Sequence, residues 1–302
     1  MKCLSERSMA YIADLVRVRS GIVVHDDKEY LVISRLAPIA RNEGYGESID
    51  ALVDSLRRKR QPRVETLIIE AMTTNETTFY RDVHPFQTLR RTLLPELIGA
   101  RRAERRLSVW SAASSTGQET YTLAIILREH FPELRQWTLR LCASDLSAAV
   151  VARAREGRYA QHEVNRGLPA EMRRKYFHQR DDHWEVVKSI RDMVEFREVN
   201  LISHWPVDYP RFDLVLLRNV LIYFNSETKV TILQRLARRM APGGVLMLGA
   251  AETTMGLDAA YERHVEGTTS FYRVRSSSPR PATYPTSNPP LHTNNHPPGV
   301  NP

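Results

Sequence analysis

From about Leu107 onward, short apolar runs alternate with helix-like runs, and this alternation is the feature that most constrains the fold. The strand-like runs are LSVWSA, LRLCASD, VEFREVNL, FDLVLLRN and GGVLMLGA, and each ends in or is followed by polar or small residues. Helix-like runs, ETYTLAIILREH and SETKVTILQRLARRM, lie between the first two strands and between the last two. Strands that alternate with helices are typical of a parallel sheet. We therefore predict an α/β fold, closed by a hairpin from YERHVEG and SFYRVR.

The rest of the chain divides into regions of different character. Residues 1–90 show helical periodicity, and Ile49, Leu52, Val53 and Leu56 form one apolar stripe, so we predict an N-terminal all-α domain there. The sheet domain is expected over 91–275. Within it, 160–192 is longer than one helix requires, and HWEVVKS alternates weakly, which predicts a small strand excursion there. The Pro-rich composition of 276–302 predicts a disordered tail.

Composition limits the classes of function. The net charge of +8 favours an anionic partner, and much of it lies in RRKRQPR (57–63) and RRAERR (101–106). Two cysteines, Cys3 and Cys142, are too few for a disulfide framework, and no Cys or His spacing predicts a metal site. No apolar run is long enough to span a membrane, and the N-terminal residues lack a signal-peptide centre. We expect a cytoplasmic, metal-free protein that does not insert into membranes.

Polar side chains follow four of the predicted strands, and ligands bind beyond the carboxyl ends of such strands. The residues at these ends are Ser114 to Glu119, Ser144–Asp145, Asn200–Leu201 and Arg218–Asn219. Small residues before a helix start let a ligand approach the backbone. An acid after the second strand commonly holds ribose hydroxyls, and a further acid can accept from an ammonium group. Since neither a Walker lysine nor a GxGxxG motif is present, a nucleoside that carries an amino acid fits better than a polyphosphate.

Five segments match one known family in order and spacing. They are NETTFYRD (75–82), WSAASSTGQETYTLA (110–124), ASDLSAAVVARAREGRY (143–159), FDLVLLRNVLIYFN (212–225) and PGGVLMLGAAET (242–253). These segments resemble the CheR family of chemotaxis-receptor methyltransferases, which use S-adenosylmethionine. The resemblance covers residues 5 to 275. It implies a Rossmann-like class I methyltransferase sheet with the hairpin, a small β-subdomain insertion at 160–198, and the all-α domain. Gln118 and Thr120 depart from the family pattern, at positions with no predicted role.

The resemblance also implies site residues. Those expected to bind the donor are Asn75, Thr77, Arg81, Glu119, Asp145, Asn200, Leu201, Arg218 and Asn219. Among these, the first three are expected around the methionine end and the methyl group, and Asn200 and Leu201 around the adenine. Arg81 and Tyr223 are the expected catalytic residues. We interpret Arg81 as a clamp for the incoming carboxylate or as a further donor ligand, and Tyr223 as a neighbour of the sulfonium.

The implied reaction is methyl transfer to a receptor glutamate, which yields a methyl ester and S-adenosylhomocysteine. A solvated glutamate has a pKa of about 4.3 and is already ionised at neutral pH, so no general base is needed. The implied partner is the acidic helical bundle of a chemoreceptor. A basic surface made of Arg57, Arg58, Lys59, Arg60 and Arg63 is expected to dock this bundle. Some family members bind a receptor C-terminal peptide on the β-subdomain, and whether this chain does so stays open.

Two rival functions remain at this point. The first is a methyltransferase that acts on RNA or on a small molecule, which the net charge permits, since a fold does not fix a substrate. The second is a donor-binding sensor without catalysis. Because no RNA-binding module is present in the sequence, no nucleic-acid partner is expected. We expect the protein to act as a monomer.

Overall fold

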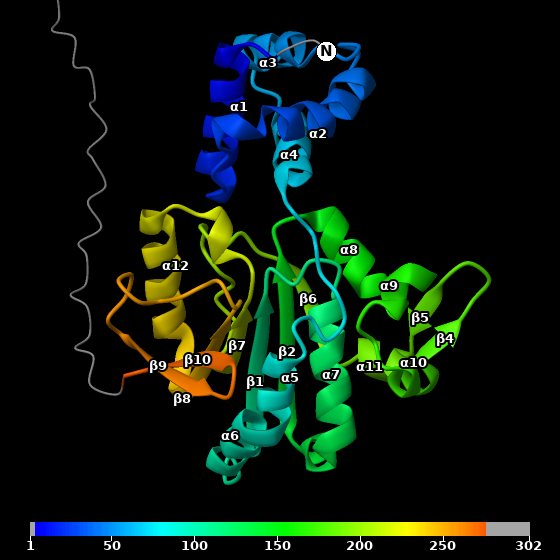
Figure 1. The fold of residues 1–302 in the computed structure, drawn as a ribbon, viewed down its shortest axis with the longest axis vertical. Helices are drawn as coiled ribbons and strands as arrows, with labels where there is room; N and C mark the ends of the chain where they lie inside the picture. Colours follow the sequence, from blue (N-terminus) through cyan, green and yellow to red (C-terminus); the bar gives the residue numbers. More distant parts are fainter. Residues whose placement is uncertain (1–3, 276–302) are drawn as a thin grey trace, which may run out of the picture.

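The computed structural model describes residues 4–275 (Figure 1). Cys3 and the tail predicted over 276–302 lie outside these described residues. The first part of the chain is helical: α1 (Glu6–Ser20), the 3-10 helix η1 (Asp26–Lys28), α2 (Glu29–Asn42), α3 (Ile49–Arg58), α4 (Pro62–Met72), α5 (His84–Thr88), the π-helical turn η2 (Leu89–Leu93) and α6 (Leu94–Ala100). None of the helices between residues 4 and 275 combines the length and the apolar character needed to cross a membrane.

Within the described residues, seven strands form the main sheet. They are β1 (Arg106–Ala112), β2 (Thr138–Asp145), β6 (Val194–Glu198), β7 (Phe212–Leu217), β8 (Met240–Leu248), β9 (Tyr261–Glu266) and β10 (Thr269–Val274). Their order is β6-β2-β1-β7-β8-β10-β9, in which the first five are parallel and β10 is antiparallel to both neighbours. This order confirms the predicted parallel sheet and its closing hairpin. The helices that accompany the sheet are α7 (Gln118–His130), η3 (Pro132–Gln136), α8 (Ala148–Glu156), η4 (Leu221–Tyr223) and α12 (Ser226–Arg239).

The central strands are buried on both faces, as expected for a parallel sheet covered by helices. Strand β7 illustrates the alternation, since all six of its residues are buried. Leu214 and Leu216 belong to the core that contains α7, whereas Val215 and Leu217 belong to the core that contains α12. The continuous apolar run of β7 therefore supplies two separate hydrophobic layers.

Helices α1 to α4 have a core of their own. Ile12, Leu36 and Leu52 are fully buried in it. By contrast, Phe86 and Leu89 pack into the core that lies against the main sheet. The separate helical core therefore ends at Met72, earlier than the predicted boundary at residue 90, because the apolar faces of the next helices contact the sheet.

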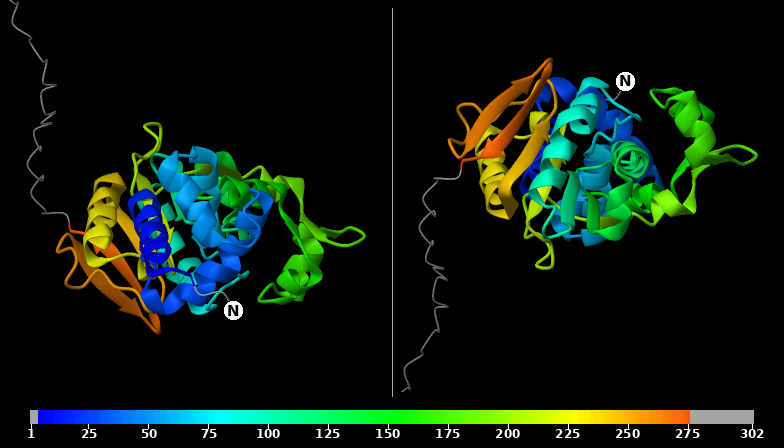
Figure 2. Two further views of the ribbon diagram at one scale, coloured as in Figure 1. Left: turned by 90° about the horizontal axis from the view of Figure 1, so that it is seen from above. Right: turned by 90° about the horizontal axis from the view of Figure 1, so that it is seen from below.

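The predicted β-insertion is present with different limits. Strands β3 (Arg158–Tyr159), β5 (Trp184–Val186) and β4 (Phe177–Gln179) form a three-stranded antiparallel sheet, in that order. It projects to one side of the main sheet and carries helices α9 (Gln161–Asn165), α10 (Ala170–Tyr176) and α11 (Lys188–Arg191) (Figure 2). The predicted range 160–198 misses β3 and includes β6, which pairs in parallel with β2 and so belongs to the main sheet.

The helical domain is fastened to the sheet domain at the C-terminal end of α1. Gly21 ends this helix at a φ of 79°, in the left-handed region. The next residue, Ile22, forms an isolated antiparallel bridge with Phe224. Asn200 reaches α1 as well, because its side-chain amide donates to the carbonyl oxygen of Arg19 at 2.6 Å. The domain therefore stands over the carboxyl ends of the parallel strands (Figure 1).

Candidate active site

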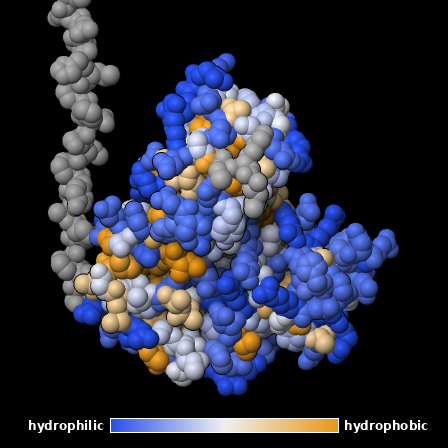
Figure 3. Space-filling model, turned by 45° about the horizontal axis from the view of Figure 1, so that its top comes forward, coloured by the Kyte–Doolittle hydropathy of each residue, from blue (hydrophilic) through white to orange (hydrophobic). Residues whose placement is uncertain are grey.

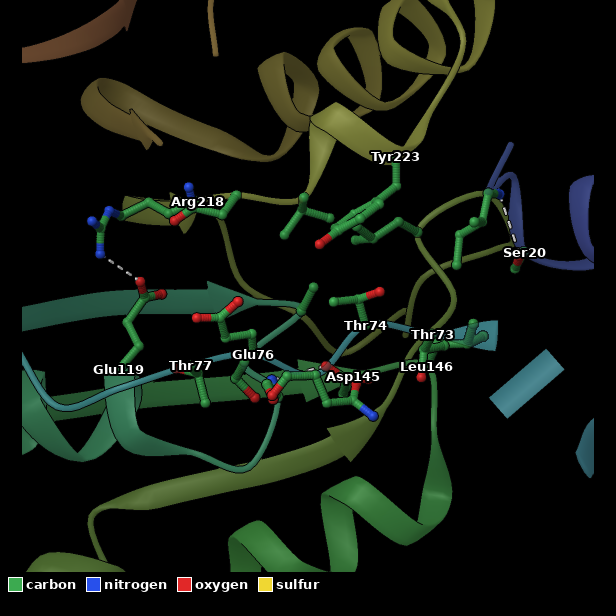
Figure 4. A pocket seen from close by; sticks show the side chains of 18 of the residues that line it. Ser20, Thr73, Thr74, Glu76, Thr77, Glu119, Asp145, Leu146, Arg218 and Tyr223 are labelled. Carbon is green, nitrogen blue, oxygen red and sulfur yellow. Dashed lines mark hydrogen bonds and ion pairs between the residues drawn. The ribbon is translucent and has the colours of Figure 1, made fainter. Parts of the chain in front are cut away.

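One cavity lies where the helical domain faces the carboxyl ends of the strands (Figure 4). The space between its walls is about 850 Å³ when the open mouth is included. All the predicted donor residues and Tyr223 line it: Asn75, Thr77, Arg81, Glu119, Asp145, Asn200, Leu201, Arg218, Asn219 and Tyr223. The sequence therefore correctly predicted which side chains converge, while their roles stay predictions.

The turn between β1 and α7 forms one wall of the cavity. Ala113, Ser115 and Gly117 all have positive φ values, of 54°, 51° and 94°. A side chain at Gly117 would come within 3.2 Å of Ala154 and of the Tyr159 hydroxyl, so these neighbours would have to shift by a few tenths of an ångström to admit one. The small residues of the turn thus serve two needs, since they adopt left-handed conformations and keep the backbone open to a ligand.

Asp145 ends β2 and fixes this turn. One of its carboxylate oxygens accepts from the backbone N–H of Ser115 at 2.8 Å, and the other accepts from that of Ser147 at 3.3 Å. Burial raises the pKa of the Asp145 carboxyl above its ordinary value, while these backbone hydrogen bonds act in the opposite direction. The carboxylate keeps lone pairs that face the cavity, as a ligand of hydroxyl groups requires.

Arg218 is the most enclosed charge of the site. Its guanidinium donates to Glu119 at 2.9 Å, to Asp82 at 2.7 Å and to the carbonyl oxygen of Arg81 at 3.1 Å. The Arg218 side chain is 1% exposed, whereas Asp82 is 43% exposed. The pair with Glu119 is drawn in Figure 4. These contacts join the end of β7, the first turn of α7 and the segment 73–83, so Arg218 holds together three walls of the cavity.

Asn219, the next residue, sits on a strained turn. Its φ is 60°, and its backbone N–H donates to Glu252 at 2.7 Å. The same carboxylate also accepts from the N–H groups of Val220, Ile222 and Gly249. A side chain at Gly249 would lie 2.7 Å from the Asn219 amide nitrogen and 2.8 Å from Glu252. Glu252 therefore fixes the turn that presents Asn219 to the cavity.

The segment 73–83 crosses the cavity and carries three of the predicted residues. The Asn75 carbonyl oxygen accepts from the Ser115 hydroxyl at 2.8 Å, which ties this segment to the turn after β1. The Arg81 guanidinium donates to the Glu76 carbonyl oxygen at 2.9 Å and forms no ion pair with any residue of 4–275. The Tyr223 side chain points into the cavity from the opposite wall (Figure 4).

The adenine end predicted at Asn200 and Leu201 is apolar on one side. Leu201 is 6% exposed, and two further apolar residues, Ile22 and Val199, line the same cavity. The Asn200 side chain is already engaged, because its oxygen accepts from the Ile202 N–H at 3.1 Å and its nitrogen binds α1. Its amide thus also positions the helical domain.

The residues present fit a polar ligand with an amino-acid end. The Ser114 hydroxyl and the Asn219 side-chain oxygen are buried without any hydrogen-bond partner within residues 4–275, and both belong to cavity-lining residues. A buried polar atom without a partner is costly, so a bound group that hydrogen-bonds to these atoms would be favoured. Together with the acids Glu119 and Asp145, they suit the ammonium and ribose groups of an adenosyl amino acid.

Sequence reasoning missed Asp82, Glu252 and two residues at the C-terminal end of α1, Ser20 and, just beyond the helix, Ile22. Asp82 and Glu252 lie within the matched segments 75–82 and 242–253. Their acidic character inside these segments was the one sequence feature that could have marked them as site residues. Nothing in the sequence indicated that the end of α1 reaches the cavity.

The predicted docking residues lie apart from the cavity, around the junction of α3 and α4. Arg60 pairs with Glu65 at 3.3 Å and Arg63 pairs with Glu43, while Arg57 lies over the Tyr11 ring. Arg58 and Lys59 form no ion pair within residues 4–275. On the face drawn in Figure 3, hydrophilic side chains cover most of the helical domain. All five residues of the basic surface are exposed, and two of them are neutralised by ion pairs.

Replacing Arg218 tests the central ion network. We expect Arg218→Met to lower the free energy of unfolding by about 3 kcal/mol, because it leaves Glu119 without its charged partner in a nearly buried place. This is the low end for a broken buried pair, since Asp82 is 43% exposed and can be hydrated. Urea unfolding measures the change. Arg174→Met is the matched control, at an exposed position on α10, and should stay within about 0.5 kcal/mol of wild type. Equal stabilities of the two variants would contradict the role of Arg218.

Comparison with known proteins places this geometry in a family. The model of the CheR methyltransferase SAM-binding domain matches residues 75–271, and that of the CheR methyltransferase all-alpha domain matches residues 7–73. The two matches meet next to Met72, where the separate helical core ends.

Named relatives agree along most of the chain. "Chemotaxis protein methyltransferase 1" of Pseudomonas aeruginosa is 39% identical over 247 residues, which cover 80% of this chain and 88% of that protein. "Chemotaxis protein methyltransferase" of Vibrio parahaemolyticus is 36% identical over 264 residues, which cover 86% of this chain and 94% of that protein. This chain therefore belongs to the CheR family of S-adenosylmethionine-dependent methyltransferases.

Proposed function

We propose that the protein methylates glutamate side chains of chemoreceptors and forms glutamate 5-O-methyl esters. The observation that carries this proposal is that one cavity brings together Arg81, which forms no ion pair within residues 4–275, and Tyr223, beside the residues expected to bind the donor. The names of the relatives, which are chemotaxis protein methyltransferases, support the same acceptor. The alternative acceptors, RNA or a small molecule, are not favoured by these relatives.

The chemistry asks the protein for orientation rather than for proton transfer. The bound donor supplies an electrophilic methyl group on a positively charged sulfur. A receptor carboxylate is ionised at neutral pH, so it needs no base to remove a proton. The cavity walls have only to hold the acceptor oxygen in line with the methyl group and exclude water, and orientation can supply up to roughly 7–11 kcal/mol.

Arg81 and Tyr223 are the groups suited to that task. The Arg81 guanidinium has a single hydrogen bond, to a backbone carbonyl, so most of its donors are free to clamp an incoming carboxylate. The Tyr223 ring can face a cationic sulfur, an interaction of about 0.5–2 kcal/mol. We further propose that the remaining polar residues of the cavity, Asn75, Thr77, Asn219 and the others predicted above, bind the donor.

The partner is proposed to be the acidic helical bundle of a receptor, met in the cytoplasm by a monomer of this chain. Arg58 and Lys59 are exposed and form no ion pair within residues 4–275, so their charges are open to such a partner. Helix α4 runs from that surface to Thr73 at the cavity and, with 11 residues, is roughly 16 Å long. A receptor bundle that contacted both the basic surface and the cavity would therefore span a distance greater than the width of one helix, about 10 Å.

Labelled donor tests the acceptor and the clamp together. Incubation with methyl-labelled S-adenosylmethionine and receptor cytoplasmic domains should label the receptor in a form that mild alkali releases as methanol. Arg81→Ala should slow this transfer on the order of 100-fold, the size of effect that removal of one positioned electrostatic donor produces. Arg211→Ala, at an exposed position before β7, is the matched control. Alkali-stable label would refute the ester, and a wild-type rate in Arg81→Ala would refute the clamp.

Charge reversal tests the docking surface. Arg58→Glu combined with Lys59→Glu should slow receptor methylation about ten-fold at low salt, because the basic surface would no longer attract acidic helices. The difference from wild type should shrink as salt is added. Arg102→Glu with Arg106→Glu changes the net charge equally at the far end of the molecule, near α6 and the start of β1 (Figure 1). If both pairs slow the reaction alike, the effect is one of net charge and the docking proposal fails.

The pH dependence of donor binding tests Asp145. Its ionised carboxylate offers acceptors to the ribose hydroxyls, and protonation removes one of them. Because burial raises the pKa of this carboxyl, affinity for S-adenosylhomocysteine should begin to fall, on acidification, at a higher pH than a solvated aspartate would give. Calorimetric titrations between neutral and acidic pH measure this. Asp145→Asn should bind more weakly at neutral pH and lose this part of the pH dependence, and an unchanged profile in that variant would assign the titration to another group.

A further inference from the structure

The small β-subdomain touches the segment that crosses the cavity at one unusually close point. Gly167, in the loop between α9 and α10, has a φ of 88°. A Cβ at this position would lie 2.0 Å from the carbonyl oxygen of Phe79 and 3.1 Å from its carbonyl carbon. Backbone thus meets backbone here, and any side chain at Gly167 would have to displace the segment 73–83.

The side chain of Phe79 extends this contact into the subdomain. The ring is fully buried, and it packs edge-on against Tyr159 of β3 and Phe177 of β4, with centroids 5.1 and 5.4 Å away. The Tyr159 hydroxyl in turn donates to the Thr116 carbonyl oxygen at 2.7 Å, in the turn after β1. Two strands of the small sheet therefore contact the crossing segment, and β3 also contacts the turn after β1 that forms the wall beside it.

Phe79 lies between two residues of the cavity, Thr77 and Arg81. The surrounding contacts leave this stretch little freedom. The Tyr80 N–H donates to the Thr122 hydroxyl of α7 at 3.1 Å, and Arg166, next to Gly167, pairs with Glu76 at 3.2 Å. The subdomain thus holds the segment from one side, while α7 and Arg218 hold it from the other.

We propose that Gly167 is a positioning residue, and that through Phe79 the β-subdomain sets the place of Thr77 and Arg81 in the donor cavity. This role concerns the enzyme's own site and is separate from any binding of a receptor peptide to the subdomain. It rests on the donor-binding part of the proposed function, and it stands or falls independently of the proposed acceptor. Binding geometry of this kind tolerates shifts of only about 0.5 Å before affinity or rate is lost.

Donor-product affinity tests the proposal, with S-adenosylhomocysteine as the probe in isothermal titration calorimetry. Gly167→Ala should raise the dissociation constant at least about ten-fold, since misplacement of binding groups by about 1 Å costs one to two orders of magnitude. Gly44→Ala is the matched control, because it also forces alanine onto a positive φ, of 84°, with nothing within 4 Å. It should bind within about two-fold of wild type. A wild-type dissociation constant in folded Gly167→Ala overturns the proposal, even if its melting temperature falls.

A second variant keeps the test decisive if Gly167→Ala does not fold. Arg166→Gln removes the ion pair with Glu76, whose partners are 67% and 61% exposed, so folding is not at risk. We expect a dissociation constant about two- to five-fold above wild type, the range for an exposed pair. Lys188→Gln removes a comparable exposed pair with Asp192 elsewhere in the subdomain and should leave the constant unchanged. If the two variants bind alike, the subdomain does not position the crossing segment, and the proposal is wrong.

Discussion

The arrangement of the site depends on one buried guanidinium. Removing an arginine from water costs several kcal/mol, and this is offset only if its partners are held in good geometry. Arg218 has Glu119 and Asp82 at 2.9 and 2.7 Å, and it also binds the backbone of Arg81. Because these partners come from α7 and from the segment 73–83, neither element can move away without exposing an unpaired charge. The cavity is therefore pre-formed. One of its walls is the segment 73–83, which leads from the helical domain to the sheet domain.

Backbone strain is concentrated around the same cavity. Ala113, Ser115 and Asn219 adopt left-handed conformations that cost of order 1–3 kcal/mol each, and such strain persists only where neighbouring contacts enforce it. Asp145 holds Ser115 and Glu252 holds Asn219, in each case through a carboxylate that accepts backbone N–H groups. Both acids follow strands of the sheet. The rigid sheet thus fixes the strained turns, and the turns present small or polar side chains to the ligand.

The sequence predicted the features that follow from periodicity. Parallel strands bring their carboxyl ends to one edge, so Asp145 and Asn219 could be placed together without any structure. The domain boundary could not be predicted in this way, because the apolar face of Phe86 and Leu89 has the same spacing as the faces inside the helical domain. Periodicity shows that a helix buries one face, but it does not show which core receives it. The contact of Asp82 with Arg218 also escaped prediction, because Asp82 lies in a loop, where no periodicity indicates which way a side chain points.

Asn200 shows why site and domain arrangement cannot be separated here. Its side chain binds the end of α1 through the Arg19 carbonyl oxygen, at the place where the adenine is expected, and Ile22 from the same helix end lines the cavity. The helical domain is therefore part of the cavity wall rather than an appendage. Since α4 is a rigid rod from the basic surface to the cavity rim, that surface stands at a fixed distance from the cavity. On the proposed function, an acceptor side chain would reach the cavity from a partner whose position is set by the same helices that complete the cavity.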